Sequence, residues 1–414
     1  MRILYINHYA GSLERGMEFR PYYLAREWQR LGHEVAVVCG SYSHLRRENF
    51  PVSDSLTRFD VEGVPYYVIR TRQYDGNGRE RALSMADFMQ GIYRHSSRLV
   101  LELRPDIVIS SSTYPLESYP VARLARLAGA TYVHEVHDMW PETLIELGGM
   151  KRSHPFVLAM ARGEHHAYSR SDYVISLLPH TLDYMLHNGL SDPARWICIP
   201  NGVAPSDWQS TQRIPAGHRS VLDRIRGSGR LIAGYAGGFA LSDHLDILLD
   251  AAARTQDLPL AYVLVGDGAE KPALLERVAE EGLANVYILD PVTKAAIPDL
   301  LRRFDSALVV TSGSPLYRFG LSPNKVYEYM MAALPVVWSV PVEDTIVDEA
   351  GCGFCVPAGD EPALLSALRR LTEMDEAERL AMGLRGRDKI LEQYTVDRLA
   401  GRFLEFISAG RGEA

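Results

Sequence analysis

The chain has 414 residues, of which 47% are apolar and 23% are charged, and its formal net charge is -8. This length exceeds one ordinary core and the composition is that of a globular protein, so we expect two domains. The negative charge argues against a general nucleic-acid binder, and four scattered cysteines argue against a disulfide framework. The first residues become polar too early for a signal peptide and the apolar runs are too short for membrane spans, so a cytoplasmic protein is expected.

Short β-branched segments alternate with amphipathic helical segments along almost the whole chain, which is the pattern of parallel α/β sheets. In the first half, strands are predicted at 3–7, 34–39, 65–69, 106–110, 131–135 and 173–176, and a helix is predicted at 21–31. In the second half, strands are predicted at 231–235, 261–265, 286–289, 307–310, 336–338 and 354–356. Each series is sufficient for one doubly wound, Rossmann-like domain.

The predicted domains are an N-terminal one at 1–203 and a C-terminal one at 229–393. Between them, 204–228 carries several Pro and Gly residues without clear periodicity, which indicates a linker. Residues 394–414 follow a predicted break at Tyr394-Thr395 and form a charged helix that could return to the N-terminal domain. Two such domains favour a ligand in the cleft between them, at the carboxyl ends of both sheets.

The segment Ser322-Pro323-Asn324-Lys325 reads as the start of a helix that holds an anion. Ser322 can cap the helix, and Pro323 suits its first position, so free N–H groups and the helix dipole can take a diphosphate. Glu328 shares a face with Lys325 and lies about 9 Å along the axis from the cap, roughly the reach to a ribose diol. The segment therefore predicts a nucleotide-sugar site, with a capped surface helix as the alternative.

Two glycine turns follow strands of the C-terminal domain. They are Gly237-Gly238 and Gly266-Asp267-Gly268. Small residues there let backbone N–H groups approach a phosphate, although a tight turn between a strand and a helix needs glycine in any case.

These motifs stand in an order that resembles family 4 of the GT-B glycosyltransferases, with Ile-Pro-Asn-Gly-Val at 199–203 before them and 332–337 and 351–354 after them. Two N-terminal segments, 16–21 and 138–142, resemble a subgroup that makes bacterial O-antigen and capsule and includes the N-acetyl-L-fucosamine transferases. The resemblance implies a retaining transferase with a nucleotide-diphosphate sugar as donor, most simply a UDP-sugar. It also implies a polyprenyl-diphosphate-linked saccharide at the inner leaflet as acceptor.

The resemblance assigns donor binding to the glycine turns and the 322–328 helix. The expected residues are Gly237, Gly238, Gly266, Asp267, Arg318, Ser322, Pro323, Asn324, Lys325 and Glu328, with Lys325 and Glu328 also catalytic. Because the sequence lacks Asp-x-Asp and a helix terminus can replace a metal ion, we expect metal-independent activity without a cofactor.

Two departures from the family pattern concern charge. The first glutamate of a Glu-x7-Glu pair would fall at Gly320, and the usual arginine and lysine after the first strand fall at Gly237 and Asp243. Lys325 and Arg318 would then have to supply the positive charge.

In the N-terminal domain, the resemblance places a histidine near the transferring sugar, and His137 is the candidate. A neutral imidazole could accept from a sugar hydroxyl with Asp138 fixing its tautomer, or His137 could simply pack under Trp140. Gly16 marks the loop at the cleft edge, where Glu18 could orient or deprotonate the acceptor hydroxyl and Arg20 could hold an acceptor phosphate. Glu18 and Arg20 could equally form a solvated ion pair.

Other interpretations remain open from the sequence. Arginines in N-terminal loops, at 46, 47, 70, 72, 79 and 81, could contact anionic lipids as a peripheral membrane site or be ordinary solvated residues. The same fold serves UDP-N-acetylglucosamine 2-epimerases, and the missing charges also permit a non-catalytic nucleotide-sugar-binding subunit.

Overall fold

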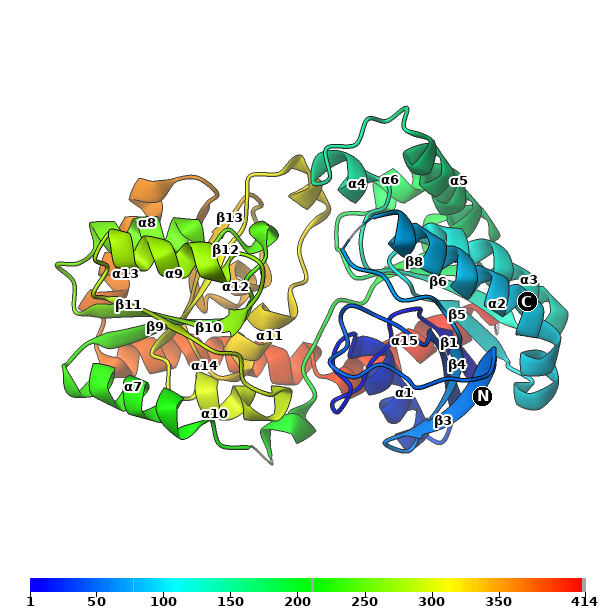
Figure 1. The fold of residues 1–414 in the computed structure, drawn as a ribbon, viewed down its shortest axis with the longest axis horizontal. Coiled ribbons are helices and arrows are strands. Elements are labelled where there is room, and N and C mark those ends of the chain that lie inside the picture. Colours follow the sequence, from blue (N-terminus) through cyan, green and yellow to red (C-terminus); the bar gives the residue numbers. More distant parts are fainter. Residues whose placement is uncertain (77, 210–211, 412–414) are drawn as a thin grey trace. The chain divides into compact units, whose positions relative to one another are not determined.

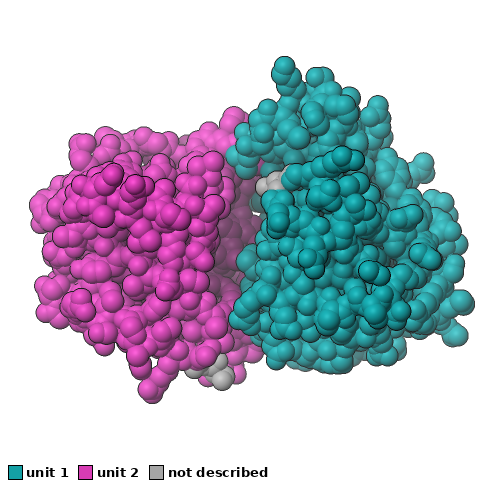
Figure 2. Space-filling model, in the orientation of Figure 1, with its two compact units in different colours: residues 1–200, 396–414 teal, residues 201–395 magenta. Residues whose placement is uncertain are grey.

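The structure, a computed structural model, describes residues 1–76, 78–209 and 212–411. The chain folds as two compact units, residues 1–200 with 396–414 (unit 1) and residues 201–395 (unit 2), coloured separately in Figure 2. Each unit is built on one β-sheet with helices around it (Figure 1). Within the described residues, no helix is both long enough and apolar enough to cross a membrane.

Unit 1 contains an eight-stranded sheet in the order β3-β4-β2-β1-β5-β6-β7-β8. All neighbouring strands are parallel except β3 and β4. The strands are β1 (Arg2–Ile6), β2 (Glu34–Gly40), β3 (Leu56–Val61), β4 (Val64–Ile69), β5 (Ile107–Ser110), β6 (Thr131–Val136), β7 (Tyr173–Ser176) and β8 (Trp196–Cys198). The helices are α1 (Arg20–Arg30), α2 (Arg79–Leu103), α3 (Ser118–Ala128), α4 (Glu142–Glu146), α5 (Pro155–Arg170), α6 (Leu182–His187) and α15 (Val396–Arg411).

Side chains of β1 alternate between two packed layers, because successive residues of a strand point to opposite faces. Leu4 and Ile6 join a core cluster with Phe88 of α2. Tyr5 faces the other way and lies 5.6 Å from Trp28 of α1 between ring centroids. Helices therefore cover both faces of this mostly parallel sheet, as such sheets require.

Unit 2 contains a six-stranded parallel sheet in the order β11-β10-β9-β12-β13-β14. The strands are β9 (Leu231–Gly238), β10 (Leu260–Asp267), β11 (Val286–Leu289), β12 (Ser306–Val310), β13 (Val336–Val340) and β14 (Gly353–Pro357). The helices are α7 (Ala216–Gly227), α8 (Asp246–Arg254), α9 (Lys271–Glu280), α10 (Ile297–Leu301), α11 (Asn324–Met331), α12 (Ile346–Ala350), α13 (Glu361–Glu373) and α14 (Glu376–Gln393). Alternate residues of β9 again serve two cores, Ile232 on one face and Tyr235 on the other.

All twelve predicted strands are present, but β3 and β8 were missed. β3 is an edge strand whose residues alternate between buried and exposed, and its turn to β4 places Glu62 and Gly63 at positive φ. Hairpin turns of this kind usually carry Asn-Gly, so the glutamate concealed the signal. β8 has only three residues.

The segment 204–228, predicted as a linker, differs from that expectation because α7 occupies much of it. Leu222 and Ile225 of this helix are buried in the core of unit 2. The two Gly residues at its ends obscured the apolar spacing.

The C-terminal helix α15 packs against α1 within unit 1. The indole Nε1 of Trp28 donates to the backbone oxygen of Ala400 at 3.0 Å, and its ring meets Phe403 edge-on at 5.1 Å. Both aromatic side chains are fully buried. α15 is therefore part of the core of unit 1, although α14, which precedes it, belongs to unit 2.

We expect Phe403→Ala to lower the free energy of unfolding of unit 1 by about 3–5 kcal/mol, because the truncation leaves a cavity beside Trp28. Urea unfolding followed by tryptophan fluorescence measures this change. Leu384→Ala, at an exposed position of α14, is the control and should change stability by less than about 0.5 kcal/mol. Equal effects of the two substitutions would contradict the role of α15.

Candidate functional site

In unit 2, the ends of β9 and β10 lie side by side, with Gly237 opposite Gly266. A Cβ added to Gly266 would lie 2.0 Å from the carbonyl oxygen of Gly237, so no other residue fits there. Gly268 has a φ of +156°, and a Cβ there would lie 2.4 Å from the carbonyl oxygen of Phe239. Asp267 is exposed, and its Oδ1 accepts a hydrogen bond from the N–H of Gly268 at 2.9 Å. Close backbone packing therefore also requires glycine at positions that were predicted to contact phosphate.

Helix α11 begins at Asn324, with Pro323 as the residue before it rather than its first helical residue. Ser322 does not cap this helix, which corrects the prediction. Its Oγ instead accepts from the N–H of Asn201 at 2.8 Å and shares a hydrogen bond with the Tyr327 hydroxyl. The Asn201 amide also donates to the Ser322 carbonyl at 2.7 Å. The Pro-Asn-Gly motif therefore fixes the approach to α11, and no side chain caps its first turn.

Lys325 lies beside the glycine turn with its charge already paired. Its Nζ lies 2.7 Å from Asp243 Oδ1, donates to the Tyr235 hydroxyl at 2.6 Å, and sits 4.4 Å from the centre of that ring. A Cβ on Gly237 would approach this Nζ to 3.2 Å. The family pattern has a cation at position 243, and Lys325 was expected to replace it. Asp243 instead pairs with Lys325 and neutralises its charge.

Glu328 forms an ion pair with Lys294, a residue that the sequence analysis missed. Lys294 lies in a short 3₁₀ turn, Lys294–Ala296, and burial lowers its pKa to about 8. A lone lysine in a loop gives no periodic or motif signal. The carboxylate assigned to the ribose therefore already has a partner.

Arg318 and Gly320 lie on the segment before α11. Arg318 is exposed, donates to the Pro315 carbonyl at 2.6 Å and stacks on Phe319 at 4.2 Å. Gly320 has a φ of +88°, a conformation that a glutamate would adopt only with strain. The missing carboxylate thus coincides with a backbone conformation that favours glycine.

In unit 1, His137 follows β6 and belongs to a buried polar network. Its Nε2 lies 2.8 Å from Ser111 Oγ and 3.1 Å from Glu135 Oε2. Ser111 Oγ donates to the same Glu135 oxygen at 2.6 Å, so it can accept from Nε2. Glu135, rather than the predicted Asp138, therefore fixes the tautomer with the proton on Nε2. The other ring nitrogen, Nδ1, has no hydrogen-bond partner among the described residues.

Arg20 is the second partner of Glu135, and its role differs from both interpretations of the sequence. Its Nε and Nη2 donate to Glu135 Oε1 at 3.0 and 2.9 Å. The guanidinium also donates to the carbonyls of Pro200 and Ile199 at 2.7 and 2.9 Å. Arg20 is only 7% exposed, so in this conformation its guanidinium is engaged inside unit 1 and presents no free face to an acceptor phosphate.

This network sets the charge on His137. Burial lowers the pKa of His137, but the hydrogen bond and charge of Glu135 outweigh it, so the net shift is upward. Burial likewise raises the pKa of Glu135, but the charge of Arg20 together with the interactions of His137 and Ser111 outweighs it, so the net shift is downward. The pKa of His137 is thus shifted toward the protonated form, in which Nδ1 is a donor, whereas a neutral imidazole was expected.

The loop that carries Gly16 and Glu18 is held by its backbone. Gly16 has a φ of +100°, and a Cβ there would lie 2.7 Å from the N–H nitrogen of Arg47. Glu18 donates its N–H to the Tyr9 carbonyl at 3.2 Å, and its partly buried side chain accepts weakly from the N–H of Arg20. Arg46, predicted among exposed loop arginines, is instead buried and donates to three backbone carbonyls.

Each of the two units matches a known protein family. Residues 15–202 match the family described as a glycosyl transferase 4-like domain, and residues 230–374 match the one described as glycosyl transferases group 1. Each unit therefore carries a match to one glycosyl transferase domain family, and together the two matches cover most of the chain.

Two relatives are also named as glycosyltransferases. The chain is 24% identical over 312 residues to the probable glycosyltransferase WbjE of Pseudomonas aeruginosa, covering 73% of this chain and 76% of that protein. It is 24% identical over 194 residues to the putative colanic acid biosynthesis glycosyl transferase WcaI of Escherichia coli K12, covering 45% and 46%. Among solved structures, Anabaena HepE in complex with UDP matches 99% of this chain and 100% of its own, at 15% identity and a TM-score of 0.68. The predicted GT-B fold is confirmed.

We expect Glu135→Gln to lower the pKa of His137, because it removes the charge that raises it. Histidine side-chain NMR across a pH titration measures the shift. The double variant Arg20→Met with Glu135→Gln avoids an unpaired buried arginine and should also lower the pKa of His137. Glu102→Gln, at the surface, should leave that pKa unchanged. An unchanged His137 pKa in both Glu135 variants would contradict this assignment.

The same shift makes unit 1 more stable when His137 is protonated. A pKa raised above the unfolded value of about 6.5 gives stabilisation that is complete below that pH. It is lost as pH rises through the folded-state pKa of His137.

We expect Asp243→Asn to tighten UDP binding about two- to fivefold, because it releases Lys325 from a partly exposed ion pair. Isothermal titration at fixed ionic strength measures this change. Asp246→Asn, which removes an exposed carboxylate from α8, is the matched control and should leave affinity unchanged. Weaker or equal binding in Asp243→Asn would show that Lys325 does not reach the ligand.

Proposed function

We propose that the protein is a retaining glycosyltransferase that moves a sugar from a nucleotide-diphosphate donor to a lipid-linked saccharide in bacterial surface polysaccharide synthesis. UDP is the proposed nucleotide, because HepE has been solved with UDP. WcaI, named for colanic acid biosynthesis, and the motifs of the N-acetyl-L-fucosamine transferase subgroup support the polysaccharide role and a hexosyl or N-acetylhexosaminyl sugar. The acceptor is proposed as a polyprenyl-diphosphate-linked saccharide at the cytoplasmic face of the inner membrane.

The observation that carries the proposal is the meeting of the glycine turn and α11 at Lys325. Backbone N–H groups at Gly237 and Gly238 and in the first turn of α11 would take the diphosphate, with Asn324 at the helix start. Lys325 would exchange Asp243 for a phosphate oxygen, a short movement for a lysine already beside Gly237. Glu328 would exchange Lys294 for the ribose hydroxyls.

Other residues would contact or position the donor around this central site. Gly266 and Asp267 would border the sugar-nucleotide, Arg318 would approach the diphosphate from the segment before α11, and Ser322 and Pro323 would hold that segment in place. Positive charge and a helix N-terminus stabilise the departing diphosphate, so we propose that no metal ion is needed.

In the proposed reaction, the acceptor hydroxyl oxygen bonds to the anomeric carbon as the bond from that carbon to the diphosphate oxygen breaks. The departing diphosphate oxygen takes the acceptor's proton on the same face, which gives retention. The products are the extended saccharide and a nucleoside diphosphate. Protein groups mainly stabilise the charge that develops on the leaving oxygen.

On the acceptor side, we assign His137 as a donor from Nδ1 to a substrate oxygen. Asp138, next in the chain, and Glu18 would orient the acceptor hydroxyl. Arg20 would act through Glu135 as a positioning residue rather than as a phosphate ligand.

The test is donor turnover with and without acceptor, in the presence and absence of EDTA. We expect Glu328→Gln to raise the donor KM and lower kcat, and Glu328→Ala to do so more strongly, with the fold intact by circular dichroism. Unchanged kinetics in both would remove Glu328 from the site. Conversion of the donor to an epimer without acceptor would identify an epimerase instead, and donor binding without any transfer to lipid-linked acceptor would identify a binding subunit.

A further inference from the structure

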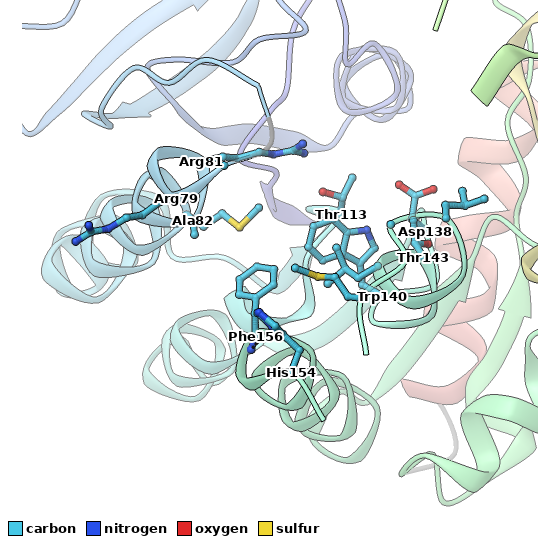
Figure 3. Close-up of a pocket in the computed structure, with 15 residues that line it drawn as sticks. Arg79, Arg81, Ala82, Thr113, Asp138, Trp140, Thr143, His154 and Phe156 are labelled. Carbon is cyan, nitrogen blue, oxygen red and sulfur yellow. Dashed lines mark hydrogen bonds between the residues drawn. The ribbon is translucent and has the colours of Figure 1, made fainter. Parts of the chain in front are cut away.

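Unit 1 contains a cavity of about 780 Å³ that the assignments above reach only at Asp138. Its volume falls within the range of small-molecule sites, about 300–1,000 Å³. It lies between the start of α2, the residues that follow β5 and β6, and the start of α5 (Figure 3). Ligands of α/β sheets bind at the carboxyl ends of strands, which is where this cavity lies.

The wall of the cavity is mainly apolar. It is formed by Met85, Trp140, Leu144, Leu147, Met150 and Phe156. The rings of Trp140 and Phe156 meet edge-on at 6.4 Å, which makes one side aromatic. A free sugar or nucleotide would leave its hydroxyls without partners against such a wall, whereas a hydrocarbon chain would bury apolar area.

Several polar side chains also line the cavity. Arg81, from the first turn of α2, extends toward Thr113 in Figure 3, whereas Arg79 points away. Thr113 lines the cavity, and its Oγ1 is buried and has no hydrogen-bond partner among the described residues. Asp138, beside His137 in the chain, borders the same cavity. An apolar wall with a cation and a hydroxyl side chain beside it fits an apolar chain joined to an anionic group.

The neighbouring surface favours a lipid as the source of such a ligand. Over residues 118–128 and 155–170, the exposed faces of α3 and α5 carry Arg123, Arg126, Arg162 and Arg170 and no exposed carboxylate. The two helices are in contact, since Tyr119 stacks on His166 at 4.0 Å. In a chain of net charge -8, this local excess of arginine complements an anionic membrane surface. Leu147, at 45% exposure, also lines the cavity.

We propose that this cavity binds the hydrocarbon chain of the acceptor lipid, with the phosphate next to the chain held near Arg81 and Thr113. The inference rests on the proposed function for the identity of the ligand as acceptor. The saccharide end would then lie beside Asp138 and His137, where the proposed reaction needs the acceptor hydroxyl. The acceptor is thus selected by its chain as well as by its sugar.

Binding of farnesyl diphosphate, geranyl diphosphate and inorganic diphosphate, measured by titration with saturating UDP present, tests the proposal. We expect farnesyl diphosphate to bind at least about tenfold more tightly than inorganic diphosphate, because each buried methylene adds affinity. Leu147→Asp should reduce that affinity about tenfold or more, and Ala82→Trp, which fills the cavity, should do the same. Leu101→Asp, at a 75% exposed position of α2 away from the cavity, should leave it within about twofold.

Equal affinity for the three probes, or no effect of Leu147→Asp and Ala82→Trp in folded protein, would overturn the inference. Sugar transfer that is equally efficient to an acceptor without a chain would also overturn it, while leaving the transferase intact. Conversely, chain-dependent binding in a protein that neither binds nor turns over nucleotide-sugars would contradict the proposed function and leave the lipid site standing.

Discussion

The buried ion pair between Arg20 and Glu135 is the interaction on which the arrangement of unit 1 depends. Two charges this deeply buried are tolerated only when both are paired and hydrogen-bonded. Arg20 meets this requirement with Glu135 and the two carbonyls at 199–200, so it joins the start of α1, the end of β6 and the end of the unit 1 sheet. Glu135 uses its second oxygen to hold His137. The same hydrogen-bond network therefore joins elements of unit 1 and shifts the pKa of His137.

Unit 2 follows a different principle, because its candidate ligands for the donor are charged groups that neutralise one another. Lys325 is paired with Asp243, and Glu328 with Lys294. Both pairs are partly exposed, so their exchange for a diphosphate and a ribose costs less than breaking a buried pair. Under the proposed function, release of these pairs would let Lys325 supply positive charge to a donor although the cations usual in the family are missing. Under the proposed function, donor affinity would therefore depend on Asp243, which stands where the family pattern has a cation.

The sequence predicted the two sheets well because their strands are buried runs of β-branched residues separated by amphipathic helices. It failed where the local pattern was ambiguous, at the half-exposed β3 and at α7 with its glycine-rich ends. For the candidate site, motifs and the family resemblance singled out Lys325, Glu328 and His137, but not the partners Lys294 and Glu135. Lys294 comes from another element that only the fold brings close to Glu328, whereas Glu135 lies two residues before His137. Ser322 shows the reverse error, since a residue type suited to a helix cap is used for a tertiary contact with Asn201.

The central claim is that a nucleotide diphosphate binds where the β9 turn meets α11. Hydrogen–deuterium exchange with and without saturating UDP tests it most directly, because the claim depends on backbone N–H groups. The account predicts slower exchange at 237–239 and in the first turn of α11, with the rest of unit 2 little changed. Protection that spares both segments, or that appears only in unit 1, would contradict it.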